Sequence, residues 1–216
     1  MRPAVFGVSD GLVSNTALIA GVAGAQAGSG SMHNVIVAGL AGLVAGAFSM
    51  ATGEYVSVAS QVELTRNEIE IEKAEIARGP AAEEAELAAL YRSRGVDAKL
   101  AKEVAKQLSK DPEQVWRVHA REELGVDPDD LPSPWLACGS SFVAFALGAV
   151  LPLLPYLFGA VTLLPSEVLA GFGQFAAGSF VTRFTTRHWL YAGGRQLVLG
   201  AAAAAVTYGI GTAVGS

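Results

Sequence analysis

The sequence predicts an all-α membrane protein with five transmembrane helices and a charged helical insert between the second and the third. Of the 216 residues, 51% are hydrophobic and only 16% are charged, whereas a soluble domain carries about 25% charged residues. The charges are also concentrated, because the 68 positions from Glu63 to Asp130 hold 28 of the 35 Asp, Glu, Lys and Arg residues. Five apolar stretches flank this insert. A single soluble globule is therefore excluded, as is a disordered or fibrous chain.

Each apolar stretch is long enough to cross the hydrocarbon core, which needs about 20 helical residues. The predicted spans are approximately residues 4–27, 35–60, 134–158, 161–182 and 189–214. Pro152 and Pro155 lie inside the third, where membrane helices tolerate proline better than soluble helices do. The first stretch could also be a signal peptide, with Ala25-Gln26-Ala27 as the cleavage motif. Because Asp10 lies early in its apolar body and the stretch is too long, we interpret it as a transmembrane helix.

Lys and Arg residues predict the orientation of these spans. All fifteen lie before the first span, in the insert, or in and shortly after the loop at 183–188. With five spans these three groups share one side of the membrane, and cytoplasmic loops carry the excess of Lys and Arg. We therefore expect a cytoplasmic N-terminus and insert, and a C-terminus on the far side. The compact chain, with no long leader, favours the plasma membrane of a prokaryote.

The insert is predicted to consist of short helices. The predicted domain boundaries are residues 1–61 for the first two spans, 62–132 for the insert and 133–216 for the last three spans. The second span should continue without a break until Arg78-Gly79-Pro80 ends it. Pro80, Asp97 and Asp111 are suited to begin the helices that follow. These helices are expected at 81–94, 97–108 and 111–124.

Composition and missing motifs exclude several classes of protein. The net charge is −5 and no basic stripe interleaved with aromatic residues is present, so nucleic acid is not an expected partner. Cys138 is the only cysteine, which excludes a disulfide framework. A ferritin-like di-iron site needs Glu-x-x-His, but none of the three histidines has Glu three residues before it. No phosphate-binding loop or Gly-x-Ser-x-Gly elbow is present, so we expect neither an enzyme nor a prosthetic group.

Asp10 is the first candidate for function, because it lies inside an apolar span. A charged residue at the centre of a membrane helix costs about 2.5–3.5 kcal/mol and usually marks a polar pathway. In the alternative reading, Asp10 lies near the membrane interface, where the partial positive charge of a helix N-terminus stabilises it.

One face of the second span and its extension carries further ligand types. Seven polar or sulfur-containing residues of this segment recur at steps of three, four or seven, and therefore share one helix face. They are Met50, Glu54, Ser57, Gln61, Glu68, Glu72 and Glu75. At 1.5 Å per residue, this stripe covers roughly 37 Å from the membrane into the cytoplasm. Met50 alone would be read as packing and Glu68 alone as a solvated charge. Their alignment on one stripe indicates a route for a cation.

Two pairs of glutamates flank the bend at Gly79. Glu72 and Glu75 lie before it, and Glu83 and Glu86 lie at matching distances after it. If the two helices fold back antiparallel, the four carboxylates converge, and they would repel one another unless a cation lay between them. Oxygen ligands of this kind suit Fe²⁺, Mn²⁺ and other divalent ions. An acidic hairpin that is simply solvated is the alternative.

Glycines at four-residue spacing recur in the first two spans, as Gly7-x3-Gly11 and Gly42-x3-Gly46. Such pairs let helix backbones approach closely. The sequence leaves open whether they pack within one subunit or form a dimer seam.

With these residues in view, the chain resembles the vacuolar iron transporter family, in its form with a cytoplasmic metal-binding domain. The matching motifs are FGVSDGLVSN at 6–15, SMATGEYVS at 49–57, Ser60-Gln61, REELG at 121–125 and SPW at 133–135. They cover nearly the whole chain and keep their order.

This resemblance implies five membrane helices, a homodimer with a pore at the subunit interface, and export of cytoplasmic Fe²⁺ in exchange for protons. It places Asp10 and Met50 on the translocation path, and we add Glu54 as a further candidate. The implied metal-domain ligands are Glu72, Glu75, Glu83, Glu86 and Glu123, beside Glu68 of the stripe. Family members often have methionine a turn before the last of these glutamates, where this chain has His119. His119 either replaces that thioether as a ligand or leaves the position without one.

Three rival functions remain at this stage. The hairpin could belong to a membrane-anchored metal sensor or buffer, although an anchor needs no intramembrane Asp10. A carboxylate-bridged oxidase would use the same glutamates, but the missing Glu-x-x-His counts against it. A transporter of the same architecture could prefer Mn²⁺, because Fe²⁺ and Mn²⁺ accept the same ligands.

Overall fold

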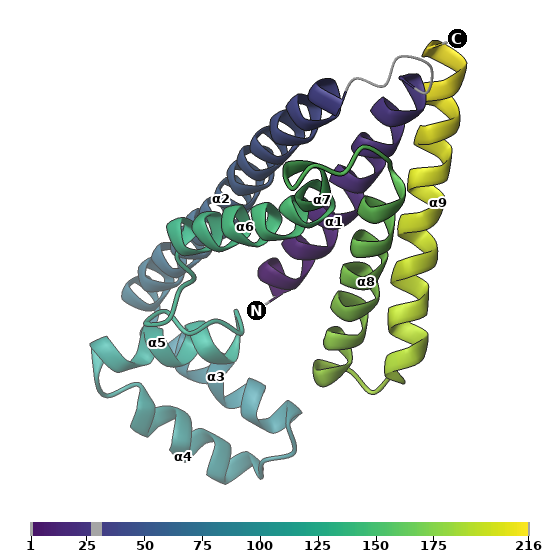
Figure 1. Ribbon diagram of the computed structural model, residues 1–216. Helices are drawn as coiled ribbons and strands as arrows, with labels where there is room; N and C mark the ends of the chain where they lie inside the picture. The colour runs from purple at the N-terminus through teal and green to yellow at the C-terminus, as the bar shows by residue number, and fades with distance from the viewer. Residues whose placement is uncertain (1, 27–31, 216) are drawn as a thin grey trace. The chain divides into compact units, whose positions relative to one another are not determined.

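The computed structural model describes residues 2–26 and 32–215, and these residues form helices and connecting turns without a strand (Figure 1). The helices of the first part are α1 (Arg2–Ala25), α2 (Met32–Arg78), α3 (Pro80–Ser93), α4 (Ala98–Leu108) and α5 (Pro112–Glu122). After them come α6 (Pro134–Val150), the 3₁₀ turn η1 (Leu151–Leu153), α7 (Leu154–Leu157), α8 (Leu164–Val181), η2 (Thr182–Phe184) and α9 (Trp189–Gly215). The predicted end of the first span at Ala27, and most of the loop after it, lie outside the described residues.

The chain divides into two compact units. The first, here called the membrane unit, contains the described residues up to Val56 and those from Pro134 onward, and the second, the insert unit, contains Ser57–Ser133. α2 is one continuous helix of 47 residues that belongs to both. Such a helix is about 70 Å long, which is more than twice the hydrocarbon thickness of about 30 Å. The predicted continuation of the second span up to Arg78 is therefore confirmed.

Four helices of the described chain are long and apolar enough to cross a membrane, namely Phe6–Ala25 of α1, α2, Pro134–Leu157 and α9. The protein is thus an integral membrane protein. α8 coincides with the predicted fourth span, but its 18 residues include Glu167 and Gln174, and it is not among the four. The number of five spans remains a prediction.

The third predicted span changes its helical form near its end. α6 stops at Val150, a 3₁₀ turn follows over Leu151–Leu153, and only the short α7 continues the span. Pro152 and Pro155 explain this change, because each lacks a backbone N–H and cannot donate to the preceding turn.

Small residues set the packing of the membrane unit around α1. α1 lies against α6, α8 and α9 (Figure 1). A Cβ atom on Gly11 would lie 2.2 Å from the Phe145 carbonyl oxygen of α6, and one on Gly46 would lie 2.2 Å from the Phe145 ring. A Cβ atom on Gly7 would lie 2.8 Å from the Cβ of Ala144. Both glycine pairs of the sequence analysis therefore pack against this chain's own helices, which supports the first of their two readings.

The insert unit begins its helices where the sequence predicts. Pro80 opens α3 after the bend at Gly79. Asp97 caps α4 by accepting from the backbone N–H groups of Lys99 and Leu100, and Asp111 caps α5 by accepting from that of Glu113. A small core of Leu87, Ala88 and Ala105 then joins α3 to α4, with Val118 of α5 packed against it. This core fixes the face that α5 presents, and with it the position of His119.

Candidate functional site

Asp10 and Met50 line one cavity of about 320 Å³ in the membrane unit. The remaining lining residues come from the same two helices and from α6, and they are Ser14, Asn15, Leu18, Gly42, Gly46, Ser49 and Phe145. The Asp10 side chain is exposed in the isolated chain, and Met50 is half-buried. The cavity thus brings a carboxylate and a thioether from two different helices to one place inside the apolar part of the protein. Glu54, the third predicted path residue, lies one turn further along α2 and does not line this cavity.

Asn15 is a polar residue of this cavity that the sequence analysis did not select. Its side chain is only 1% exposed, and its Nδ2 donates a hydrogen bond of 2.6 Å to the carbonyl oxygen of Ala149. Its Oδ1 is buried and has no hydrogen-bond partner in the described chain. The signal was present, because an amide inside an apolar span is as unusual as a charge, but only charged residues of the first span were considered.

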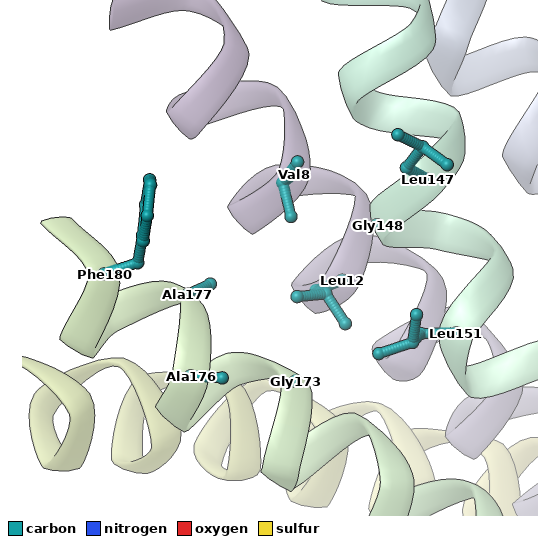
Figure 2. Close-up of a pocket in the computed structure, with 9 residues that line it drawn as sticks. All are labelled: Val8, Leu12, Leu147, Gly148, Leu151, Gly173, Ala176, Ala177 and Phe180. Atoms are coloured by element: carbon teal, nitrogen blue, oxygen red, sulfur yellow. The ribbon is translucent and has the colours of Figure 1, made fainter.

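A larger cavity, of about 540 Å³, lies between α1, α6 and α8 and has an almost wholly apolar lining. Figure 2 shows Leu147, Leu12 and Phe180 around this space, each from a different helix. Metal ions require oxygen, nitrogen or sulfur ligands. None of its lining side chains, which are all Val, Leu, Gly, Ala or Phe, offers one. The smaller cavity with Asp10 is therefore the candidate cation path.

The insert unit contains a compact set of possible metal ligands, formed by Glu72 of α2, His119 of α5 and Glu123, the residue that ends α5. One ligand atom from each lies within 4.8 Å of the others. The Nδ1 atom of His119 is 2.9 Å from an oxygen of Glu72 and 2.9 Å from an oxygen of Glu123. We call these three residues the Glu72–His119–Glu123 cluster.

Unsatisfied polar atoms are concentrated in this cluster. Glu72 Oε1, Glu123 Oε1 and both ring nitrogens of His119 are buried, and none of them has a hydrogen-bond partner among the described residues. His119 is 0% exposed and Glu72 is 7% exposed. Leaving a buried polar group unpaired costs about 1–3 kcal/mol, and native proteins rarely leave several together. A cation that binds these atoms would remove that cost.

The raised pKa values of Glu72 and Glu123 also favour a bound cation. Burial is the largest cause that raises the pKa of Glu72, and the negative charge of Glu123 raises it further. Burial likewise raises the pKa of Glu123; the neighbouring His119 lowers it, and the charges of Glu86 and Glu83 raise it. Raised pKa values mean that the carboxylates hold their negative charge at a cost when no cation is bound.

The other predicted metal ligands lie at different distances from the cluster. An oxygen of Glu83 lies 3.9 Å from His119 Nδ1. Glu75 and Glu86 are exposed, and their charges are close enough to raise the pKa of Glu72 and Glu123 respectively. Glu68 is also exposed, and it is not part of the cluster. The sequence predicts that two pairs of glutamates face each other across the bend. In the structure, Glu72 and Glu83 lie near His119 of α5, and Glu123, which follows α5, joins them.

The basic side chains of the insert unit that lie nearby are engaged elsewhere. Lys73 pairs with Glu70 at 2.8 Å and lies over the ring of Trp116. Arg94 pairs with Glu122, and Arg121 with Asp127. No Lys or Arg among the described residues forms an ion pair with Glu72 or Glu123, and the basic side chain nearest to both is the His119 imidazole. The negative charge of the cluster is thus available to a metal ion.

The spacing within the cluster fits direct coordination. Metal–ligand bonds of about 2.1 Å that meet at right angles place neighbouring ligand atoms about 3.0 Å apart. The two separations of 2.9 Å around Nδ1 have this length. Two carboxylate oxygens and one imidazole nitrogen are ligands for divalent first-row transition metals.

Known proteins resemble this chain over almost its whole length. The sequence pattern of the VIT family matches residues 1–212. The chain is 40% identical over 220 residues to a vacuolar iron transporter of Acanthamoeba castellanii, covering 98% of this chain and 77% of that protein. It is 32% identical to vacuolar iron transporter 1 of Eucalyptus grandis, covering 100% of this chain and 87% of the relative. The corresponding protein of Arabidopsis thaliana is also 32% identical, with 96% and 83% covered. The chain therefore belongs to the VIT family and is a membrane transporter of metal ions, not an enzyme.

Proposed function

We propose that this protein exports Fe²⁺ from the cytoplasm in exchange for protons, with Mn²⁺ as a second substrate. The observation that carries the proposal is the cavity of the membrane unit, in which the Asp10 carboxylate and the Met50 thioether meet. An intramembrane carboxylate is costly and would be of no use to a protein that only anchors a soluble unit. The names of the relatives, vacuolar iron transporters, favour iron as the substrate.

In this proposal the insert unit faces the cytoplasm and captures the metal. Its ligands are those of the Glu72–His119–Glu123 cluster, with Glu83 next to it and Glu75, Glu86 and Glu68 as outer acidic residues. The metal then moves along the face of α2 that carries Glu54 and Met50. Met50 adds a soft ligand, which favours Fe²⁺ over Mg²⁺ and Ca²⁺.

A homodimer would complete the path. A two-fold axis beside α1 and α2 would bring two Asp10 carboxylates and two Met50 sulfurs around one ion, because a two-fold interface repeats every residue. The exposed position of Asp10 in the isolated chain is compatible with such an arrangement. When metal leaves on the far side, two like-charged carboxylates in a low-dielectric site take up protons. This exchange couples metal export to proton import without leaving an unpaired charge in the membrane.

The matched relatives also bear on the host membrane. The matched relatives are eukaryotic proteins whose names describe them as vacuolar. They give no support to the plasma membrane of a prokaryote, which the sequence analysis favoured. What we retain is the orientation, with the N-terminus and the insert unit on the cytoplasmic side.

A membrane-anchored metal buffer is the second candidate function. The observation that favours it is that the Glu72–His119–Glu123 cluster is more completely enclosed than the cavity of the membrane unit. In a buffer this cluster would bind metal and nothing would cross the membrane.

Transport in sealed liposomes separates the two. The purified protein is reconstituted, a pH gradient is imposed, and Fe²⁺ entry and internal pH are followed together, for the native chain, for Asp10→Asn and for the surface control Asp130→Asn. We expect Fe²⁺ entry matched by proton exit, lost in Asp10→Asn and kept in Asp130→Asn. Metal binding without any flux in the native protein would reject transport and leave the buffer. Flux of Fe²⁺ without proton movement would reject the exchange alone.

A further inference from the structure

We propose that His119 determines the metal selectivity of the insert unit, so that the Glu72–His119–Glu123 cluster binds Fe²⁺, Co²⁺ and Zn²⁺ in preference to Mn²⁺, Mg²⁺ and Ca²⁺. This inference rests on the proposed function only in requiring that a metal ion binds the cluster. It assigns to one side chain a discrimination that carboxylates make only weakly, because Fe²⁺ and Mn²⁺ both accept oxygen ligands.

The fold holds the imidazole in a single place. α5 begins at Pro112 behind the Asp111 cap, and His119 and Glu123 follow on the same face, four residues apart. The backbone N–H of Glu123 donates to the carbonyl of His119 at 2.8 Å, which keeps the turn that joins them closed. Val115 and Ala120 beside His119 are buried as well. The ring therefore cannot swing out to solvent without opening α5.

The His119 ring has more polar capacity than the surrounding protein uses. Nδ1 lies 2.9 Å from oxygens of both Glu72 and Glu123, and one N–H group cannot satisfy both carboxylates. Nε2 is buried and has no hydrogen-bond partner among the described residues. One ligand atom from each of the three residues lies within 4.8 Å of the other two, as a shared metal ion would require.

An imidazole ligand enlarges the differences in affinity between divalent metals. Affinity for nitrogen-containing sites rises from Mn²⁺ through Fe²⁺ and Co²⁺ toward the later metals, and imidazole suits Fe and Zn, whereas carboxylate and water suit Mg²⁺, Ca²⁺ and Mn²⁺. Replacing the nitrogen by an oxygen at the same position should therefore weaken the binding of Zn²⁺ far more than that of Mn²⁺. Asn is the suitable replacement, because its Oδ1 can occupy the position of Nδ1.

The test measures Zn²⁺ and Mn²⁺ binding to the full-length protein in detergent, by titration of the native chain and of His119→Asn. The control is His33→Asn, which removes an exposed histidine of the membrane unit. We expect His119→Asn to weaken Zn²⁺ binding about ten- to a hundredfold, the range in which changes around a metal centre act. Mn²⁺ binding should change much less, and the control should change neither.

The possible outcomes are distinct. Equal losses for Zn²⁺ and Mn²⁺ would overturn the inference and make His119 a positioning residue. Absence of metal binding in the native protein would reject the cytoplasmic capture step of the proposed function instead. If His119→Asn fails to fold by circular dichroism, pulsed electron paramagnetic resonance of Cu²⁺ bound to the native protein decides. Nitrogen modulation from a coordinated imidazole that persists in the double variant His33→Asn/His188→Asn supports the inference, and its absence overturns it.

Discussion

The two candidate metal sites of this protein have related ligands but differ in how far these ligands are buried. In the cavity of the membrane unit, the Asp10 carboxylate is exposed and Met50 is half-buried, with open volume between them. In the insert unit, His119 and Glu72 are buried, and one ligand atom from each of three residues lies within 4.8 Å of the other two. The first site is open, whereas the second is largely enclosed.

This difference suits the proposed transport of an ion from one site to the other. An ion moves through a site only if it can leave again, so a path needs weak or divided binding. A site that captures a scarce ion needs a full set of preorganised ligands. In the proposed function the two sites separate capture from passage, and Met50 and Glu72 lie on one uninterrupted helix.

The largest effect should come from Gly11→Ala, which disrupts the membrane unit. The new Cβ would lie 2.2 Å from the carbonyl oxygen of Phe145 and 2.8 Å from the backbone nitrogen of Ala149, so α1 and α6 must separate. Overpacking commonly costs about 1–3 kcal/mol, and a clash with backbone cannot be relieved by turning a side chain. We expect the yield of monodisperse protein in detergent to collapse. Gly139→Ala, at a position of α6 with nothing within 4 Å, is the matched control and should be as stable as the native chain.

The next largest effect should come from Glu123→Gln, which removes a charge from the cluster. We expect Zn²⁺ affinity to fall about ten- to a hundredfold, measured by titration of the purified protein. Glu122→Gln is the neighbouring control, because the Glu122 carboxylate pairs with Arg94 and accepts from Tyr91 instead. Equal affinities in the two variants would contradict the assignment of the cluster.

The sequence predicts most of this fold because its signals are local. Asp97, Asp111 and the proline after Gly79 act on the backbone within a few residues of themselves, and each helix begins where they predict. The break in the third span is a local effect too. The sequence analysis predicts only that the membrane helix tolerates Pro152, not that the α-helix ends beside it. The predicted fourth span coincides with α8, whose 18 residues include Glu167, and it stays a prediction.

The candidate sites are less predictable, because they depend on contacts between distant segments. Spacing alone placed Glu72 and Glu83 near one bend, but it contained no information on where α5 would lie. His119 and Glu123 entered through family resemblance, and the packing of Val118 near Leu87 shows why they reach Glu72. Asn15 was missed because its role depends on Ala149, 134 residues away.

A smaller effect is expected from Met50→Leu, which keeps the volume and removes the sulfur of the membrane path. Volume-conserving swaps in a packed interior usually cost less than about 1.5 kcal/mol, so the fold should survive. Because a thioether favours Fe²⁺ over harder ions, the ratio of Fe²⁺ to Mn²⁺ flux in liposomes should fall several-fold, with Zn²⁺ affinity of the insert unit unchanged. A parallel loss of that affinity would show that the two sites are not separate.

The smallest effect concerns the pH dependence of the insert unit, and its sign depends on the metal. Burial raises the pKa of Glu72 and Glu123 above their unfolded values, so the metal-free native state binds more protons than the unfolded chain in the window above pH 4.5. Stability therefore falls as pH rises through that window. Hydrogen exchange at the Glu123 amide, corrected for intrinsic rates, should be slower at pH 5 than at pH 7 without metal.

With Zn²⁺ bound, the slope should reverse, because metal binding requires deprotonated carboxylates and protons compete with it. Protection of the same amide, which is bonded to the His119 carbonyl, should then increase from pH 5 to pH 7. Zn²⁺ reverses the pH dependence of this protection only if the cluster itself binds the ion. Parallel slopes would mean that Zn²⁺ binds elsewhere on the chain and that the buried carboxylates are neutral structural groups. In that case the contrast between a closed capture site and an open path would no longer hold.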